Sequence, residues 1–511
     1  MPGEHRATGH CVKSAPFGTF APKKEREKKC IPLAPWLERE INLPFANKRL
    51  PRLLSQRCRH PYAPLFNRHA TTDIINLYVL PLFMAGDGEP REAIGTRKTS
   101  DADREKEQQI LTKLKAGSMK IYELEKELPP VDAVRVRREF IGQVTQTTLE
   151  QVGTFSIDIG RVVQRNCENM IGTVQVPLGV AGPIIVNGEY AKGEFWFPLA
   201  TTEGALVASV NRGCNAIVKA GGADVRILHD GMTRAPVFAA ESIVHAKEIV
   251  DWVDSHRDEL AAIAQGTTSH GKLTDIVTFI AGTSVFVRLE FDTKDAMGMN
   301  MVTIASAKVA DEIAHHTRAR LVALSGNMCT DKKPAAINGI LGRGRSTVAG
   351  VLLSHELIAQ VFKTDAATMV EVNYRKNLVG SARAGSMGFN AHAANVVAAM
   401  FIACGQDAAH AIDGATCMTT IDLTQTGAYV AVTLPSLPVG TVGGGTGVGT
   451  QQECLKMLGV AGGGNPPGAN AKKLAEIIAS GVLAGELSLI GALAAQHLAR
   501  AHKELGRGEK R

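Results

Sequence analysis

The stretch that decides the fold is a strand pattern in the middle of the chain, Val285-Phe286-Val287-Arg288-Leu289-Glu290-Phe291. Valine, leucine and phenylalanine occupy every second position, and Phe286, Arg288 and Glu290 lie between them. Because successive side chains of a strand point to opposite faces, this alternation predicts a half-buried antiparallel strand. Arg288 and Glu290 are therefore expected on the less buried face.

The segments on either side of this strand complete a regular order of elements. Residues 236–238 have the composition of a short strand, and residues 243–264 carry apolar side chains at helical spacing. A further strand precedes residues 285–291, a second helix covers roughly residues 298–315, and residues 321–324 form the last strand. The resulting order, β-α-β-β-α-β, is the ferredoxin-like split motif.

Segments of mixed helix and strand pattern flank this motif, so we predict an α/β (α+β) fold in which a large, helix-rich domain carries an inserted ferredoxin-like small domain. The N-terminal part of the domain is expected to hold one helix from about residue 103 to 128, which Pro129 and Pro130 end, and another over residues 133–143. The predicted divisions are a basic, poorly ordered leader (1–105), a helical segment (106–150), the first part of the large domain (151–233), the small domain (234–325), and the second part of the large domain (326–511), with a C-terminal helix over residues 469–504.

Composition narrows the possible functions. The formal charge of +7 arises largely in the first 70 residues, so it describes the leader and does not predict nucleic-acid binding. Nine cysteines are scattered without a Cys-x-x-Cys pair, which argues against a disulfide framework or a zinc site. We therefore expect no metal and a reducing compartment.

The leader carries a targeting signal in its composition. Residues 41–72 contain arginine and lysine but no acidic residue, which suits a mitochondrial transit peptide; a cytosolic location is the alternative. The only apolar run in this region, residues 74–85, contains Pro81 and is shorter than the roughly 20 residues that a membrane span needs. We predict a soluble protein without a transmembrane segment.

A second stretch, from Ser325 to Asn338, carries chemistry. It places Asp331 directly before Lys332 and Lys333, among small polar residues. A desolvated ammonium stabilises an oxyanion, and a neighbouring carboxylate can hold it in position. A solvated charged turn would have the same composition, so this stretch alone does not show whether its lysines are catalytic.

Five segments, taken in order, resemble the catalytic domain of 3-hydroxy-3-methylglutaryl-CoA (HMG-CoA) reductase, of the eukaryotic type (class I) and without its membrane domain. The segments are residues 200–204, 295–300, 325–338, 405–409, and 486–489 followed by His502. The resemblance runs from about residue 107 to 505. It implies a two-step, NADPH-dependent reduction of the HMG-CoA thioester to mevalonate with release of CoA, the first step of the mevalonate pathway to isoprenoids and sterols.

The resemblance also implies four catalytic residues. Lys332 would polarise the thioester and aldehyde carbonyls, and Glu203 would act as general acid with a pKa raised by its small, apolar neighbours. Asp407 would orient both, although a helix-capping aspartate would look the same in sequence. His502 would protonate the leaving thiolate, because imidazolium titrates near neutral pH; His497 is the less suitable alternative.

Binding residues follow from the same resemblance. Arg234 and Lys376 are expected to grip the glutaryl carboxylate, and the full set of substrate-binding residues is Ser209, Asn211, Arg212, Arg234, Ser325, Asp331, Lys333, Lys376 and Asn395. No Gly-x-Gly-x-x-Gly fingerprint is present, so a conventional Rossmann site is not predicted. NADPH would instead be held by Asp295, Met297, Gly298, Met299, Asn300, Gly443, Gly444, Gly445 and Thr446. Thr268 and Ser269 stand where animal relatives carry the Ser-Arg pair that holds the 2′-phosphate, so selectivity for NADPH is expected to be softer.

Two other functional classes remain open at this level. A CoA-dependent transferase or lyase would need a nucleophilic cysteine beside a histidine, and neither Cys329 nor Cys404 has an adjacent histidine. A catalytically inactive binding module would have lost at least one of the four catalytic residues. The small residues of the C-terminal helix suit a buried or subunit-interface position, and we expect a homodimer or homotetramer with sites at the interface.

Overall fold

The computed structural model describes the main chain of residues 101–506 and the side chains of residues 103–496. The predicted leader and its apolar run lie outside the described residues, except that residues 101–105 already belong to helix α1 (Asp101–Lys115). The expected long helix to residue 128 is wrong. It is interrupted at Gly117, whose φ of 71° suits a residue without a Cβ, and resumes as η1 (Ile121–Glu123) and α2 (Leu124–Glu127).

Pro130 begins a helix here. It occupies the first turn of α3 (Pro130–Thr145), where its missing N–H has no helical partner to lose. Helices α4 (Glu150–Gly153) and α5 (Ile159–Arg165) follow. Arg137 of α3 is fully buried and donates to the carbonyl oxygens of Ile121 and Met170, so a charged side chain ties this segment together.

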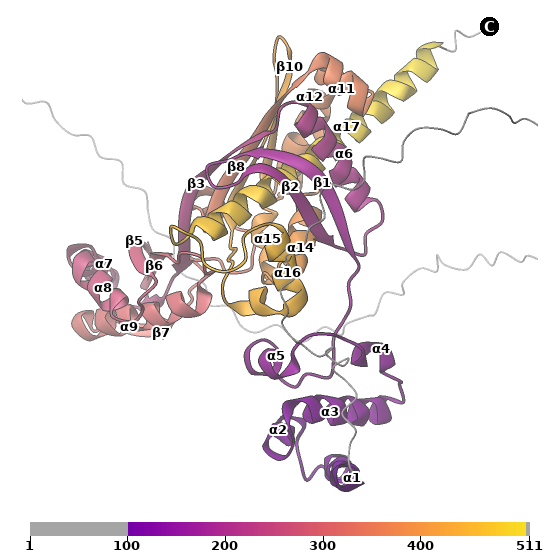
Figure 1. The fold of residues 1–511 in the computed structure, drawn as a ribbon. Coiled ribbons are helices and arrows are strands. Elements are labelled where there is room, and N and C mark those ends of the chain that lie inside the picture. The colour runs from indigo at the N-terminus through magenta and orange to yellow at the C-terminus, as the bar shows by residue number, and fades with distance from the viewer. Residues whose placement is uncertain (1–100, 507–511) are drawn as a thin grey trace, which may run out of the picture. The chain divides into compact units, whose positions relative to one another are not determined.

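One large sheet organises the second part of the chain (Figure 1). Its strands lie in the order β2-β1-β3-β8-β10-β9, and only the β1–β3 pair is parallel. Strand β3 also joins the two sheets: its first part pairs with β8, and Met232 to Arg234 pair with β6 of the small sheet. The strand bounds are β1 (Leu178–Asn187), β2 (Lys192–Ala200), β3 (Ala223–Arg234), β8 (Gly344–Ser354), β9 (Met418–Leu423) and β10 (Gly427–Leu437).

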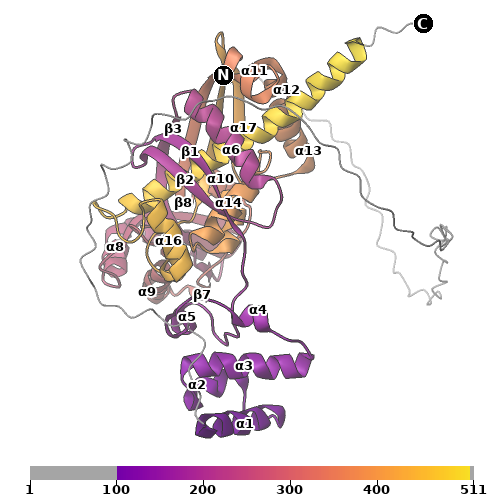
Figure 2. The same ribbon diagram turned by 45° about the vertical axis from the view of Figure 1, so that its right-hand side comes forward.

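Most helices of this part of the chain pack on the sheet, and the others pack on those helices (Figure 2). They are α6 (Leu206–Lys219), α10 (Ala336–Leu341), α11 (His355–Phe362), α12 (Ala366–Val372), η2 (Asn373–Gly380), α13 (Ser381–Ala384), α14 (Ala393–Ala403), η3 (Ala408–His410), α15 (Ala411–Gly414), η4 (Gly444–Gly447), α16 (Gly449–Met457) and α17 (Ala469–Gly506).

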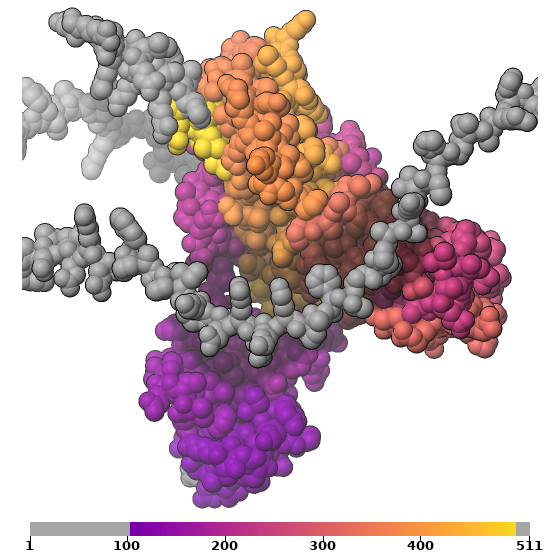
Figure 3. Space-filling view, turned by 180° about the vertical axis from the view of Figure 1, so that it is seen from behind, coloured from indigo at the N-terminus to yellow at the C-terminus, as the bar shows by residue number. Residues whose placement is uncertain are grey.

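The predicted β-α-β-β-α-β order is confirmed, and its atoms form a compact group of their own (Figure 3). The antiparallel sheet has the order β7-β4-β6-β5, with bounds β4 (Val237–Ala239), β5 (Lys272–Ala281), β6 (Ser284–Asp292) and β7 (Arg320–Ala323). The expected single helix over residues 243–264 is two helices, α7 (Ile243–Ser255) and α8 (Arg257–Gln265), and α9 (Met299–Thr317) is the second.

One expectation about β6 is wrong. Arg288 is only 1% exposed, although the alternation places it on the less buried face. The face of β6 that carries Arg288 is covered by the segment that follows β7, and Gly326 of that segment packs against Phe286. A two-residue period says which side chains share a face, but not what covers that face.

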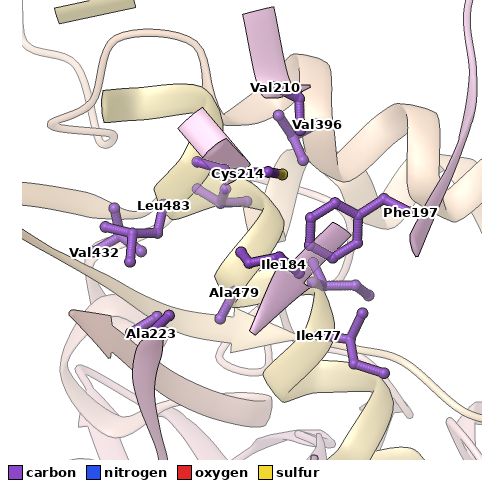
Figure 4. Close-up of a cluster of buried hydrophobic side chains, with 14 of the residues drawn as sticks. Ile184, Phe197, Val210, Cys214, Ala223, Val396, Val432, Ile477, Ala479 and Leu483 are labelled. Atoms are coloured by element: carbon purple, nitrogen blue, oxygen red, sulfur yellow. The ribbon is translucent and has the colours of Figure 1, made fainter. Parts of the chain in front are cut away.

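Helix α17 is the central element of the large core. The core gathers apolar side chains from β1, β2, α6, α14, β10 and α17 (Figure 4). Gly213 of α6 packs so closely on α17 that a Cβ there would lie 1.9 Å from the carbonyl oxygen of Ala484, so the predicted close approach of small residues is confirmed. Within residues 101–506, only the segment Ala469–Gln496 is long and apolar enough to cross a membrane, and 83% of its apolar window is buried inside the protein, as in a core helix.

Candidate active site

The loop between β7 and α10 carries Lys332 and has an unusual backbone. Asn327, Thr330 and Lys332 all have positive φ values, 63°, 44° and 57°. Such conformations cost roughly 1–3 kcal/mol each for residues other than glycine and persist only where the surroundings impose them. The shape of this loop must therefore be set by its contacts.

Those contacts come from a buried cation. The guanidinium of Arg288 donates to the carbonyl oxygens of Met328, at 2.7 Å, and Gly342, at 2.6 Å, and burial lowers its pKa. Asn338 holds the same loop, because its amide donates to the carbonyl oxygen of Thr330 at 3.1 Å. The contacts that Arg288 and Asn338 make with this loop are called the clamp below. Sequence reasoning missed the role of Arg288; an arginine between the buried Val287 and Leu289 was the available signal.

Lys332 and Asp407 form an ion pair, as the sequence predicted. The distance from Lys332 Nζ to Asp407 Oδ2 is 2.7 Å. Asp407 also caps η3 by accepting from the backbone N–H of Ala409 at 3.1 Å, so the capping and charge-pairing interpretations are both correct. Burial alone would raise the pKa of Asp407, but the hydrogen bond from Lys332 and the charge of His410 lower it overall. The Lys332 side chain is 42% exposed, less buried than expected.

Behind this pair lies a buried charge network that sequence reasoning missed. His410, Asp413 and Arg343 are each at most 1% exposed. Arg343 Nη2 lies 2.8 Å from Asp331 Oδ1, Arg343 Nη1 lies 3.5 Å from Asp413 Oδ2, and His410 Nδ1 lies 2.7 Å from Asp413 Oδ2. The available signal was the spacing of three between Asp407, His410 and Asp413, which brings them together on short helical turns.

Glu203 lies in a separate cluster. It follows β2 and accepts a hydrogen bond of 3.1 Å from the amide of Asn395, at the start of α14. The expected apolar setting is not found in the single chain, where Glu203 is exposed. Among the described residues, no hydrogen bond or ion pair joins Glu203 to Lys332 or Asp407.

A pocket of about 700 Å³ collects the predicted cofactor residues. Met297, Gly298, Met299 and Asn300 line it together with Gly443, Gly444, Gly445 and Thr446, and Asp407 lies on its wall. The two segments meet because Gly440 passes so close to Met297 that a Cβ there would lie 2.3 Å from the Met297 nitrogen. The pocket also receives the N-terminus of the 19-residue helix α9, whose free amides attract phosphate.

Asp295 is the exception among these residues. Its buried carboxylate accepts from the backbone N–H groups of Gly464, Gly468 and Ala471, so it caps the start of α17. The carboxylate is therefore engaged in holding the start of α17 against the loop before α9. Asp295 is not among the residues that line the pocket, and a part for it in binding the cofactor stays a prediction.

The loop that stands in for the Ser-Arg pair lies beside the pocket. Thr268 contacts Met301, a lining residue, with 3.2 Å between its hydroxyl and the Met301 sulfur. The same hydroxyl accepts from the backbone N–H groups of His270 and Gly271, which shapes the loop.

Four of the predicted substrate residues gather around the Lys332 loop. Arg234 Nη1 lies 3.8 Å from Asp331 Oδ2, and its other nitrogens donate to Thr303 of α9. Lys333 donates to the carbonyl oxygen of Asp331, and the Ser325 hydroxyl lies 3.5 Å from Cys329 Sγ. Asn395 belongs instead to the Glu203 cluster.

The remaining predicted residues are placed differently. Ser209 and Arg212 of α6 both contact Ser488 of α17, and Asn211 accepts from the backbone N–H of Gly182. These side chains position α6, which begins just after Glu203, and their role in binding substrate stays a prediction. Lys376 is exposed in η2 and contacts Asn377 at 3.4 Å, and the side chain of His502 lies outside the described residues.

Similarity to known proteins extends over most of the chain. The family profile described as Hydroxymethylglutaryl-coenzyme A reductase matches residues 133–507. A 3-hydroxy-3-methylglutaryl-coenzyme A reductase of Halobacterium salinarum is 51% identical over 398 residues, 78% of this chain and 98% of the relative. That of Methanothermobacter thermautotrophicus is 52% identical over 78% of this chain and all of the relative, and reductase 1 of Dictyostelium discoideum is 44% identical over 79% of this chain and 74% of the relative.

The fold is also similar to a solved structure. The class II 3-hydroxy-3-methylglutaryl-CoA reductase of Streptococcus pneumoniae, solved bound to NADPH in open conformations, aligns with a TM-score of 0.54 at 21% identity. The alignment covers 76% of this chain and 96% of that structure, so the two share the mixed α/β architecture. The profile match and the identities near 50% show that this chain belongs to the hydroxymethylglutaryl-coenzyme A reductase family.

Proposed function

We propose that this chain reduces the thioester of 3-hydroxy-3-methylglutaryl-CoA to the alcohol of mevalonate, with two NADPH and two protons consumed and CoA released. The observation that carries the proposal is the Lys332–Asp407 ion pair on the wall of the pocket lined by the predicted cofactor residues. A cation held beside a cofactor pocket is what the reduction of a carbonyl requires.

The residues of the pocket fit the cofactor. The N-terminus of α9 and the glycines 443–445 offer backbone N–H groups to phosphate without a side chain in the way. NADPH, when bound, supplies the hydride for each reduction. Thr268 and its loop would face the adenosine side, which is why we propose that discrimination against NADH is incomplete.

Lys332 donates to the carbonyl oxygen and stabilises the negative charge that grows on it in both steps. Asp407 holds the Lys332 side chain in position through the 2.7 Å contact. Glu203 donates the proton that the aldehyde oxygen takes up, and His502 protonates the leaving thiolate. Arg234, Ser325, Asp331 and Lys333 would anchor the substrate beside Lys332, with Lys376 and Asn395 on the Glu203 side.

The exposure of Glu203 bears on the assembly. An acid that works in a water-excluded site has to be covered, and in the single chain the Glu203–Asn395 pair is open. We propose a homodimer or homotetramer in which the catalytic sites lie at the subunit interface. We also propose the class I type, which the 44–52% identities to the archaeal and Dictyostelium relatives support, against 21% for the class II structure.

The test follows NADPH absorbance at 340 nm together with CoA release, in the wild type and in Lys332→Ala. We expect two NADPH oxidised per CoA, and a loss of about 10²–10³-fold or more in kcat in the variant. Lys308→Ala, which removes an exposed lysine of α9, is the matched control and should retain wild-type activity. Binding of the CoA ester without oxidation of NADPH or NADH would favour the transferase or lyase class.

A further inference from the structure

His410 stands at the end of η3, buried directly behind the ion pair of the proposed site. It is fully buried, and its Nδ1 lies 2.7 Å from Asp413 Oδ2. Its Nε2 lies 3.8 Å from Asp407 Oδ2 and 3.6 Å from Asp331 Oδ1, and it is a buried nitrogen without a hydrogen-bond partner. The proposed function assigns no role to this side chain.

Both ring nitrogens of His410 face carboxylates. A neutral imidazole has one donor nitrogen and one acceptor nitrogen, whereas an ionised carboxylate only accepts. In the neutral ring, one lone pair would therefore face carboxylate oxygens in a dry interior. The imidazolium form presents N–H groups on both sides and removes this conflict.

The charged groups around the ring come from each neighbouring element. Asp407 and Asp413 belong to η3 and α15, Asp331 and Lys332 to the loop before α10, and Arg343 precedes β8. Arg343 is shared between Asp331 and Asp413, Lys332 pairs with Asp407, and Arg234 lies 3.8 Å from Asp331. These three cations match the three carboxylates in number, so the case for a charged ring rests on the carboxylate oxygens that face both of its nitrogens.

We infer that His410 is a positioning residue for Asp407: held as an imidazolium by Asp413, it places a buried positive charge behind the carboxylate that pairs with Lys332. The inference rests on the proposed function only in so far as Asp407 holds the catalytic lysine. His410 is not a catalytic residue, because Asp407 stands between it and the pocket.

Asp407 Oδ2 is the atom through which His410 would influence Lys332. The same oxygen of Asp407, Oδ2, lies 2.7 Å from Lys332 Nζ and 3.8 Å from His410 Nε2, so this carboxylate lies between the lysine on its outer side and the imidazole on its inner side. Asp331 Oδ1 is slightly closer to the ring, at 3.6 Å, but it is already paired with Arg343. After the opposing effect of burial and the hydrogen bond from Lys332, the charge of His410 is the next contribution to the pKa of Asp407, and it lowers that pKa.

The expected consequence has a definite sign. A carboxylate with a depressed pKa stays ionised as the pH falls, and it loses its charge only at its lower folded-state pKa. His410→Gln keeps a hydrogen-bonding amide but removes the charge, so Asp407 should protonate at a higher pH. The acid limb of the kcat profile should move up by about 1 pH unit, in line with the effect of a charge 4 Å away.

The test compares wild type, His410→Gln and Asp413→Asn from pH 3 to 8, a range that includes the region where Asp407 titrates, with kcat and the KM for HMG-CoA measured separately. We expect the acid limb to move upward in both variants, more in His410→Gln, with KM within about twofold because no proposed substrate contact is removed. His245→Gln is the matched control, because His245 is a buried histidine that bonds backbone groups of the small domain and lies outside the network. A superimposable profile, or a raised KM at unchanged kcat, would overturn the inference.

A second measurement does not depend on turnover. In protein labelled with [γ-13C]aspartate, and with Asp407→Asn to assign the signal, the Asp407 carboxyl should titrate at higher pH in His410→Gln than in wild type. If His410→Gln does not fold, Asp413→Asn takes its place in both experiments. An inactive wild type would refute the proposed function, whereas an unchanged Asp407 titration would refute the role of His410.

Discussion

The Lys332 cluster and the Glu203 cluster hold the two halves of the proposed chemistry, and the molecule builds them very differently. Lys332 stands on a loop clamped by Arg288 and Asn338, and its partner Asp407 lies against the buried network of His410, Asp413 and Arg343. Glu203 is exposed and has one neutral side-chain partner, Asn395. The difference shows that the chain fixes the position of the proposed charge-stabilising group and leaves the proposed acid on an open surface.

A physical reason for this asymmetry lies in the cost of misplacing a charge. An oxyanion-stabilising cation contributes most when its position needs no rearrangement during the reaction. Positive φ at Lys332 and burial of Arg343 are costs of that rigidity, and they are offset by carbonyl and carboxylate partners. A proton donor on an open surface carries no such internal support.

Among the changes considered, substitution of Arg288 should have the greatest effect on the contrast between the Lys332 cluster and the Glu203 cluster. Arg288→Met removes the buried cation and leaves the carbonyl oxygens of Met328 and Gly342 unpaired, so we expect a loss of about 3 kcal/mol in unfolding free energy. The freed loop should also lower kcat at least tenfold. Urea denaturation and steady-state kinetics measure both quantities.

Arg257→Met is the control for this change. Arg257 is an exposed arginine of the small domain that pairs with Asp254 and Asp275, and exposed pairs contribute less than about 1 kcal/mol. A stable Arg288→Met protein with full kcat would show that the loop keeps its strained shape without the clamp, and the contrast between the two clusters would lose its basis.

Double-mutant cycles would measure the coupling energy within each of the two residue pairs. Lys332→Ala with Asp407→Asn should show a coupling of about 2 kcal/mol in kcat, whereas Glu203→Gln with Asn395→Ala should show about 0.5 kcal/mol in the dissociated chain. The reason is that a charge pair backed by buried groups resists water better than one exposed amide contact. The cycles are measured from single-turnover rates.

Changing the oligomeric state of the protein provides a control for these cycles. If a partner subunit covers Glu203, the coupling between Glu203 and Asn395 should rise under conditions where the protein is oligomeric. Equal couplings for both pairs at every protein concentration would contradict the view that the second cluster is the less organised one.

The smallest effect is expected at the edge of the clamp, where His229 Nε2 lies 3.0 Å from Glu290 Oε2. The hydrogen bond to Glu290 raises the pKa of His229 above 6.5. The stability from this pair is therefore fully present below pH 6.5 and is lost as the pH rises through the folded-state pKa. His229→Gln should lower the unfolding free energy by less than about 1 kcal/mol at pH 6, since the pair is partly exposed, and by almost nothing at pH 9.

Urea denaturation at the two pH values provides the measurement, with His355→Gln, an exposed histidine of α11, as the control. A loss of the same size at pH 6 and pH 9 would mean that His229 acts by packing against Gly342 and not through its charge.

Much of the fold could be predicted from local pattern. The β-α-β-β-α-β order followed from periodicity, and the pairing of Lys332 with Asp407 followed from resemblance. Residues 243–264 were predicted as one helix because apolar spacing continues across His256, where the helix in fact breaks. For Ser209 and Arg212, the sequence did not say which face of α6 meets α17, and the structure shows that both side chains contact Ser488 there.

The amino-acid sequence alone was enough to predict the β-α-β-β-α-β order, the family, and the residue types available for catalysis. Only the tertiary structure decided that Arg288, Arg343 and His410 are buried, and that Asp295 caps α17. The physical reason is that periodicity reports contacts within a segment, whereas the burial of a charge depends on which distant segments cover it. Arg288 and Gly342 are far apart in the chain, and their 2.6 Å contact exists only once β6 and the loop before β8 have come together.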